Sequence, residues 1–150
     1  MTTRAASPGA AAARAAAGHW LVKQEPDSYS WADFAREGRA GWEGVRNYQA
    51  QNNLRLMKPG DPVLFYASGD ARSVVGIAAV ARAAYPDPTA DEPGWVAVDL
   101  RPDRPLPRPV TLARIKAEPS LRDILLVRNS RLSVMPLPRE AFLRIVAMGS

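Results

Sequence analysis

The chain has 150 residues, 47% of them apolar, which is the usual size and composition of one domain with one buried core. It contains no cysteine and one histidine. The chain therefore lacks the residues for a disulfide framework, a zinc site or a nucleophilic triad built on Cys or His. The formal net charge is +5, of which residues 1–18 contribute +2 and the other 132 residues +3 (18 basic and 15 acidic), a mild excess that suits a nucleic-acid partner.

Residues 1–18 are nearly all Ala, Gly, Ser, Thr and Pro, with two arginines and no acid. We expect a disordered extension here and one ordered domain over 19–150. The basic, acid-free composition also fits an organellar transit peptide. No apolar run approaches the roughly 20 residues that cross a bilayer. We therefore expect a monomer of the bacterial cytosol that uses no membrane, metal or cofactor.

Turn and capping signals divide the first half of the ordered chain. Residues 19–23 have the composition of a strand, which is stopped by the turn-like segment 25–27. Ser30 stands at capping-box spacing before Asp33, which predicts a short helix that ends at Gly38. Asn47 is a good N-cap for a second helix, which ends before residues 59–60 (Pro-Gly).

The second half alternates short strands and helices without an internal repeat. Strand spacings are too small for regular βαβ units, which predicts a compact α+β, barrel-like domain. The patterns predict strands at 62–67, 74–84, 95–100 and 131–135, helices at 111–116 and 138–146, a turn at 68–70, and proline-rich loops at 86–94 and 102–109.

Residues 42–50 (WEGVRNYQA) resemble the signature of the EVE domain family, which belongs to the superfamily that holds the PUA and YTH folds. Four further segments are similar to the family in the same order: 20–26, 63–66, 84–89 and 131–136. The resemblance covers about 19–146 and implies a PUA-like mixed β pseudobarrel with short flanking helices. It also implies a pocket for a flipped or unpaired modified base in DNA or RNA, with 5-methylcytosine or 5-hydroxymethylcytosine as the leading candidates, and recognition instead of catalysis.

Two positions depart from the family pattern. Ala67 stands where the family often has His after the Phe-Tyr pair, and the loop at 90–94 is shorter than usual. We expect the first difference to bear on the base edge that is read. The second is expected to reduce contacts to the flanking strand.

A base-reading pocket needs an aromatic platform. Trp42 lies between Gly41 and Gly44 in a segment with no clear helical or strand period, where a ring can line a cleft. A base stacked on it would gain roughly 1–3 kcal/mol. The alternative is a buried tryptophan that plugs one end of the barrel.

The segment after Trp42 offers groups for a phosphate or base edge. Val45, Arg46 and Asn47 precede the second helix, where free N–H groups and the helix dipole favour an anion. Asn47 can instead use its side chain to cap the helix, and Arg46 can pair with Glu43.

Polar residues on three strands complete the predicted site. Lys23 and Glu25 stand at i and i+2, so they share a face if the first strand continues; a plain ion pair is the alternative. Glu25 would accept from the exocyclic amino group of cytosine. Trp20, Trp31, Phe34, Phe65 and Phe142 are assigned to the core. The predicted base-binding residues are Lys23, Glu25, Trp42, Val45, Arg46, Asn47, Tyr66, Ser68, Arg131 and Ser133.

Three functions compete at this point. The first is a non-catalytic module that recognises a modified base, favoured by the lack of a metal site and an activated nucleophile. The second resembles the amidohydrolases of the ASCH domains, with Lys23, Glu25 and either Ser68 or Ser133 acting on a modified nucleoside. The third is a protein-interaction domain whose aromatic residues are all core, which predicts no pocket deep enough for a base.

Overall fold

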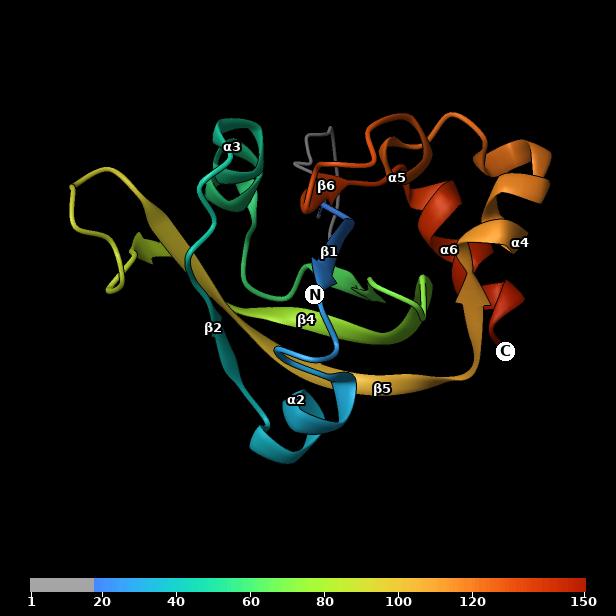
Figure 1. The fold of residues 1–150 in the computed structure, drawn as a ribbon, viewed down its shortest axis with the longest axis horizontal. Helices are drawn as coiled ribbons and strands as arrows, with labels where there is room; N and C mark the ends of the chain where they lie inside the picture. Colours follow the sequence, from blue (N-terminus) through green and yellow to red (C-terminus); the bar gives the residue numbers. More distant parts are fainter. Residues whose placement is uncertain (1–17) are drawn as a thin grey trace, which may run out of the picture.

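A computed structural model of the chain describes residues 18–150, so the predicted extension lies, apart from Gly18, outside the described residues. A single curled sheet of six strands, in the order β2-β5-β4-β3-β1-β6, carries the fold (Figure 1). The strands are β1 (Trp20–Gln24), β2 (Ala40–Trp42), β3 (Pro62–Ala67), β4 (Ser73–Pro86), β5 (Val96–Thr111) and β6 (Val134–Pro136). The helices are α2 (Trp31–Glu37), α3 (Tyr48–Leu56), α4 (Leu112–Ala117), the 3-10 turn η1 (Pro119–Leu121), α5 (Leu125–Arg128) and α6 (Arg139–Met148).

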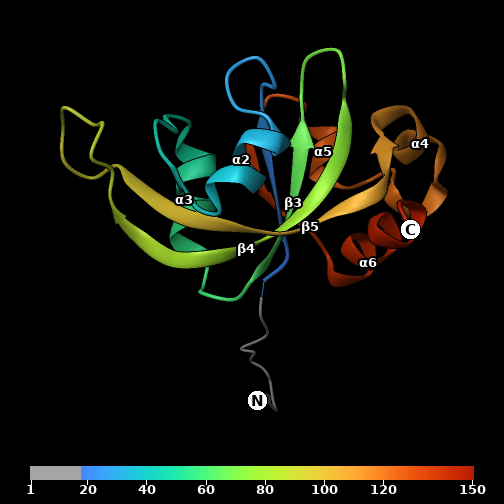
Figure 2. The same ribbon diagram turned by 90° about the horizontal axis from the view of Figure 1, so that it is seen from below.

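The β4–β5 hairpin contains the two longest strands of the sheet, and the helices pack around it. Figures 1 and 2 show α2 on its outer side and α3, α5 and α6 on the other. Strand β1 runs parallel to β3, with Lys23 opposite Tyr66 and Gln24 opposite Ala67, while the other strand pairs are antiparallel. Parallel strands end at the same edge of a sheet, so the polar residues that follow β1 and β3 lie next to each other.

The predicted helix starts are confirmed. Ser30 and Asp33 form a reciprocal capping box at the start of α2, and Gly38 ends this helix with a left-handed φ of 76°. Asn47 caps α3 by accepting a hydrogen bond from the backbone N–H of Ala50 at 2.9 Å. These signals are local, because each capping side chain accepts a hydrogen bond from a backbone N–H only three residues further along the chain.

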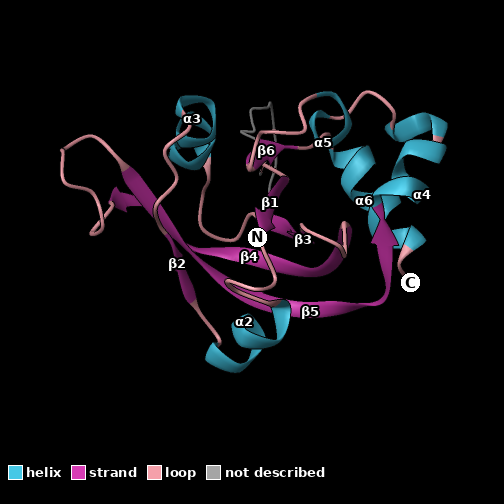
Figure 3. Ribbon diagram, in the orientation of Figure 1, coloured by secondary structure: helices cyan, strands magenta, loops and turns pink. Residues whose placement is uncertain are grey.

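The prediction of a loop at 102–109 is wrong, because β5 continues through these prolines to Thr111 (Figure 3). Strand β2 pairs with β5 only at 98–100, so within residues 18–150 the rest of that side of β5 pairs with no other strand, although Arg108 N donates to the Gly149 carbonyl at 3.0 Å. A proline lacks the N–H that a central strand needs, but it is tolerated at an edge and at bulges. The β4–β5 register shifts at several points, which accommodates the prolines further.

Two other strand predictions need correction. Strand β6 covers only Val134–Pro136, so Arg131 and Ser133 precede it instead of lying within the strand predicted at 131–135. Strand β2 was not predicted, because its three residues are too few to show a period.

The residues assigned to the core from the sequence pack inside. Trp20, Phe34, Phe65 and Phe142 are buried, and Trp31 is partly buried against them. Within residues 18–150 no helix is both long and apolar enough to cross a membrane.

Candidate functional site

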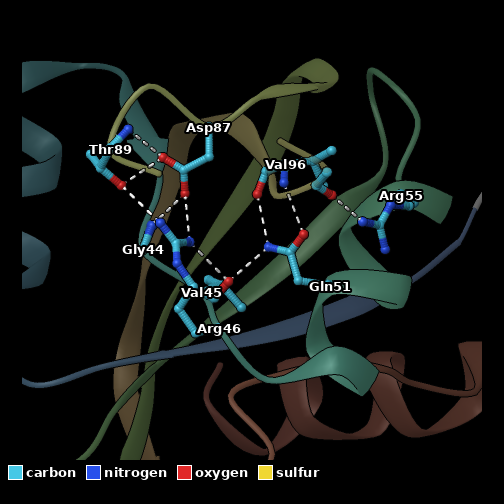
Figure 4. Close-up of polar contacts among 9 residues, drawn as sticks. Gly44, Val45, Arg46, Gln51, Arg55, Asp87, Thr89 and Val96 are labelled. Carbon is cyan, nitrogen blue, oxygen red and sulfur yellow. Dashed lines mark hydrogen bonds and ion pairs between the residues drawn. The ribbon is translucent and has the colours of Figure 1, made fainter. Parts of the chain in front are cut away.

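The loop at 43–47, which joins β2 to α3, is held by the buried carboxylate of Asp87 (Figure 4). The backbone N–H of Gly44 and the guanidinium of Arg46 both donate to Oδ2 of Asp87, at 2.8 and 2.9 Å. Thr89 donates to Oδ1 through its backbone N–H and its hydroxyl, at 2.7 and 2.6 Å. Burial alone would raise the pKa of Asp87, but these hydrogen bonds outweigh it and hold the pKa below the usual range.

Gln51 of α3 supports the same loop from the other side. Its amide nitrogen donates to the carbonyl oxygens of Val45 and Val96, at 2.8 and 2.9 Å, and its amide oxygen accepts from Val96 N at 2.8 Å. The side chain is fully buried, so these bonds satisfy groups that water cannot reach. Gln51 thus joins the loop, α3 and the start of β5 into one unit.

The structure shows the partners that Asn47 and Arg46 have within the chain. The Asn47 side chain caps α3, as described above. Arg46 pairs with Asp87, not with Glu43, and its guanidinium lies 5.2 Å from the ring centre of Trp95. Both side chains therefore have structural partners, and the Arg46 side chain is 37% exposed.

Sequence reasoning missed Asp87 and Gln51. Asp87 lies inside the family-like segment 84–89, but a lone aspartate among prolines does not reveal a partner 41 residues away. Gln51 lies on the buried side of a helix, where an apolar residue is more usual. No sequence pattern predicts that its side-chain amide makes three hydrogen bonds with backbone groups.

Trp42 is buried, with 3% of its surface exposed. Its ring packs edge-on against Tyr29, Phe34 and Phe65, with centroid distances of 6.3, 5.9 and 6.0 Å. The indole is thus part of the aromatic core, and no open face is available for stacking in this conformation. A hollow of about 350 Å³ nevertheless adjoins it, lined by Gln24, Tyr29, Glu37, Arg39, Ala40, Gly41 and Trp42 and by none of the other nine predicted residues.

The carboxylate of Glu37 lines the hollow beside Trp42, and only one of its two oxygens accepts a hydrogen bond from another of the described residues. The Tyr29 hydroxyl donates to Oε1 of Glu37 at 2.6 Å, and burial together with this bond raises the pKa of Tyr29, which stays protonated. Among the described residues, Oε2 of Glu37 has no hydrogen-bond partner. It is therefore free to accept a hydrogen bond from a ligand.

A donor on the same wall is fixed by a second network. Arg39 donates to Oδ2 of Asp99 through Nε at 3.1 Å and Nη2 at 2.9 Å, and the Tyr85 hydroxyl donates to Oδ1 of the same carboxylate. Burial and this bond raise the pKa of Tyr85 to about 12. Arg39 keeps further N–H groups for a ligand, because a guanidinium carries five. The hollow can thus offer a planar heterocycle both an acceptor and donors.

Other predicted residues meet on a different part of the sheet. The Lys23 ammonium donates to the Ser130 carbonyl at 2.8 Å and lies 5.7 Å from the ring centre of Tyr66, which is buried. Burial lowers the pKa of Lys23 and raises that of Tyr66. Ser133 takes part through its carbonyl, which accepts from Lys23 N at 3.0 Å. Arg131 is exposed.

Glu25 and Ser68 lie at the neighbouring turn. The Ser68 hydroxyl donates to the carbonyl of Gln24 at 3.0 Å, and the exposed Glu25 lies against Gly69, where a Cβ would come within 2.4 Å of its Oε1. In the described part of the chain no ion pair or side-chain hydrogen bond joins Lys23 to Glu25 or to either serine. The set invoked for an amidohydrolase is therefore not connected.

Residues 18–150 contain no group of three or more His, Cys, Asp or Glu side chains that could hold a metal ion.

Comparison with known proteins places this geometry in a family. The sequence model described as "EVE domain" matches residues 18–148. The chain belongs to the EVE domain family. This EVE domain is similar to human thymocyte nuclear protein 1, with 32% identity over 83% of this chain and 70% of the human protein.

Solved structures agree with the EVE assignment. The crystal structure of Atu2648 from Agrobacterium tumefaciens is 43% identical, with a TM-score of 0.87, covering 89% of this chain and 94% of that one. Human THYN1 in complex with DNA containing 5-methylcytosine is 30% identical, with a TM-score of 0.82, covering 89% and 98%. The predicted α+β, PUA-like fold is confirmed. An ASCH protein from Zymomonas mobilis, 16% identical with a TM-score of 0.54 over 89% and 96%, shares the fold alone.

Proposed function

We propose that this EVE domain is a non-catalytic module that binds DNA carrying a 5-substituted cytosine. The observation that carries the proposal is the human relative, whose crystal structure is a complex with 5-methylcytosine-containing DNA and whose fold matches nearly the whole described chain. The relatives bear no enzyme name, and the ASCH likeness extends only to the fold.

We place the base in the hollow beside Trp42. Its volume of about 350 Å³ is at the lower end of ligand sites, about 300–1,000 Å³, which suits one heterocycle taken out of the base stack. The free oxygen of Glu37 accepts from the amino group of cytosine, and Arg39 donates to a ring acceptor. Thymine presents a carbonyl where cytosine has its amino group, so the Glu37 carboxylate repels it.

The residues predicted from the sequence have different places in this proposal. Trp42 is a wall of the hollow instead of a stacking platform, and the exposed Arg131 and the exposed part of Arg46 contact the DNA backbone. Val45 and Asn47 belong to the loop that follows Trp42 and leads to α3, and they shape that loop without lining the hollow. Lys23, Glu25, Tyr66, Ser68 and Ser133 support the sheet edge from which Gln24 projects.

Glu37→Gln tests the proposal with little risk to the fold, because Glu37 is exposed. The change removes a full negative acceptor, so we expect affinity for a 5-methylcytosine oligonucleotide to fall roughly 5- to 150-fold, the range for losing one good base contact. Fluorescence anisotropy at one salt concentration measures this, with probes that differ only in 5-methylcytosine, cytosine or thymine at one position.

Glu140→Gln, an exposed carboxylate on α6, is the matched control and should bind as the unaltered protein does. Equal affinity of the unaltered protein for the modified and unmodified probes would overturn the proposed function. If that preference is present but survives Glu37→Gln unchanged, the base is read somewhere other than in this hollow.

A further inference from the structure

Tyr48, the first residue of α3, forms a solvent-exposed aromatic pair with Trp95. Tyr48 is 77% exposed, the largest exposed fraction among the large apolar side chains of residues 18–150. Its ring stacks on that of Trp95, with a centroid distance of 5.3 Å and an interplanar angle of 21°. A ring so exposed adds little to folding, because its burial is small, and the face of Tyr48 that does not stack on Trp95 is open to a ligand.

The two rings rest on a rigid support. Arg46 lies over the Trp95 ring and is itself fixed by Asp87. From the same helix as Tyr48, Arg55 donates to the Gly94 carbonyl and so ties the loop before Trp95 to α3 (Figure 4). A platform held in this way loses little conformational freedom when a ligand binds it.

A hollow of about 360 Å³ lies beside the pair, bounded by Tyr48, Arg55, Gly94 and Trp95. Glu92 lines it as well, so one arginine and one carboxylate face this space and the site is not strongly basic. A bound phosphate would gain little there. The π-face of Tyr48 is the dominant feature, and it suits a flat, uncharged group.

The aromatic pair and the hollow beside Trp42 are joined by one short loop of the chain. Only six residue steps separate Trp42 from Tyr48, a span of at most about 20 Å. The intervening Glu43, Gly44, Arg46 and Asn47 are all exposed. A strand whose modified base enters the first hollow can therefore reach Tyr48 within a few nucleotides along this loop.

We propose that Tyr48, stacked on Trp95, is a second binding site, which takes the unpaired base of a nucleotide that flanks the modified cytosine. This inference rests on the proposed function and deepens it. Stacking on an aromatic ring is tolerant of sequence, because every base has a π-face. The site therefore requires unpaired DNA beside the modified base and adds affinity without adding base preference.

Two probes and three variants test it. One single-stranded oligonucleotide carries 5-methylcytosine between natural nucleotides, and the other carries it between abasic sites. Tyr48→Leu, which keeps bulk and removes the π-face, should bind the first probe roughly 5- to 150-fold more weakly and the second unchanged. Tyr48→Phe should bind both as the unaltered protein does. Leu56→Ala, an exposed apolar residue at the other end of α3, is the control and should have no effect.

The outcomes separate this site from the proposed function. If the unaltered protein prefers 5-methylcytosine to cytosine but Tyr48→Leu leaves both probes unaffected, the flanking-base site is overturned while the proposed function stands, and Tyr48 is then free to face a protein partner. Equal losses on the two probes also overturn it, since the effect would not depend on a flanking base. Absence of any preference for 5-methylcytosine overturns the proposed function and this site with it.

Discussion

Asp87 is the residue on which the shape of the signature loop depends. Its carboxylate is fully buried, and it accepts four hydrogen bonds from Gly44, Arg46 and Thr89. A buried carboxylate is tolerable only when its oxygens are satisfied in this way. The ion pair and the three other bonds therefore act as one network, which keeps Arg46 over Trp95.

Asp87→Asn should lower the free energy of unfolding at neutral pH by about 1–3 kcal/mol, because buried donors lose their acceptor. The pKa of Asp87 is lower in the folded chain than the ordinary value of about 3.9. The stability it contributes is thus fully present above that value and is lost as the pH falls toward the folded pKa. The difference between the two proteins should accordingly shrink in acid. Urea denaturation at neutral pH and near about pH 3 measures it.

Asp103→Asn is the control for this comparison, because Asp103 is exposed on β5. It should leave the free energy of unfolding nearly unchanged at both pH values. Parallel losses of stability for Asp87→Asn and the unaltered protein across the pH range would contradict the assigned role of Asp87.

At the scale of single residues, the sequence indicated which residue types are present but not which partners they meet. Trp42 was identified as notable, but its burial follows from the pairing of Trp42 with Val98, which turns the ring toward Phe65. Likewise Lys23 and Glu25 stand at strand spacing, yet β1 ends at Gln24 and Glu25 turns to Gly69. Side-chain direction at a strand end depends on contacts that are distant in the chain.

Among whole elements, those with local signals were predicted well. Helices α2 and α3 begin where their caps predict, since Ser30 and Asn47 act within their own first turn. The proline-rich half of β5 was not predicted, because proline excludes a central strand but not an edge strand. Whether a strand is at an edge is decided by its neighbours in the sheet, which the local sequence does not contain.

Asn47→Ala should lower the free energy of unfolding by about 0.5–2 kcal/mol, the usual effect of removing an N-cap. The start of α3 carries Tyr48, so fraying of its first turn should also weaken DNA binding. Asn47→Ser keeps a capping oxygen and should restore both properties. Chemical denaturation and anisotropy on the same samples provide the two measurements.

Asn52→Ala, at an exposed position within α3, controls for changes in helix propensity and should have a small effect on both properties. A different result would reassign Asn47. If Asn47→Ser folds as stably as the unaltered protein but loses affinity for the DNA, then its amide contacts the ligand directly and capping is not its main role.

Across the whole molecule, the net excess of positive charge is small, and about a third of the basic side chains in residues 18–150 are paired with a carboxylate. The part of the chain that the structure describes carries a net charge of +3, and Arg36, Arg39, Arg46, Arg104, Arg128 and Arg144 each pair with a carboxylate. Proteins that hold DNA mainly by its backbone usually present a clustered basic face. DNA binding of the proposed kind is therefore expected to depend more on the base and less on phosphates.

That charge distribution predicts a weak dependence of binding on salt. For a site that contacts about four phosphates, the logarithm of the association constant for single-stranded DNA should fall with the logarithm of salt concentration with a slope of about −3. The 5-methyl group is uncharged, so probes with 5-methylcytosine and cytosine should give parallel lines that differ only in height. Anisotropy titrations over a series of potassium chloride concentrations measure both. A much steeper slope, or lines that converge at high salt, would mean that phosphates drive the binding and that the hollow beside Trp42 contributes little to selectivity.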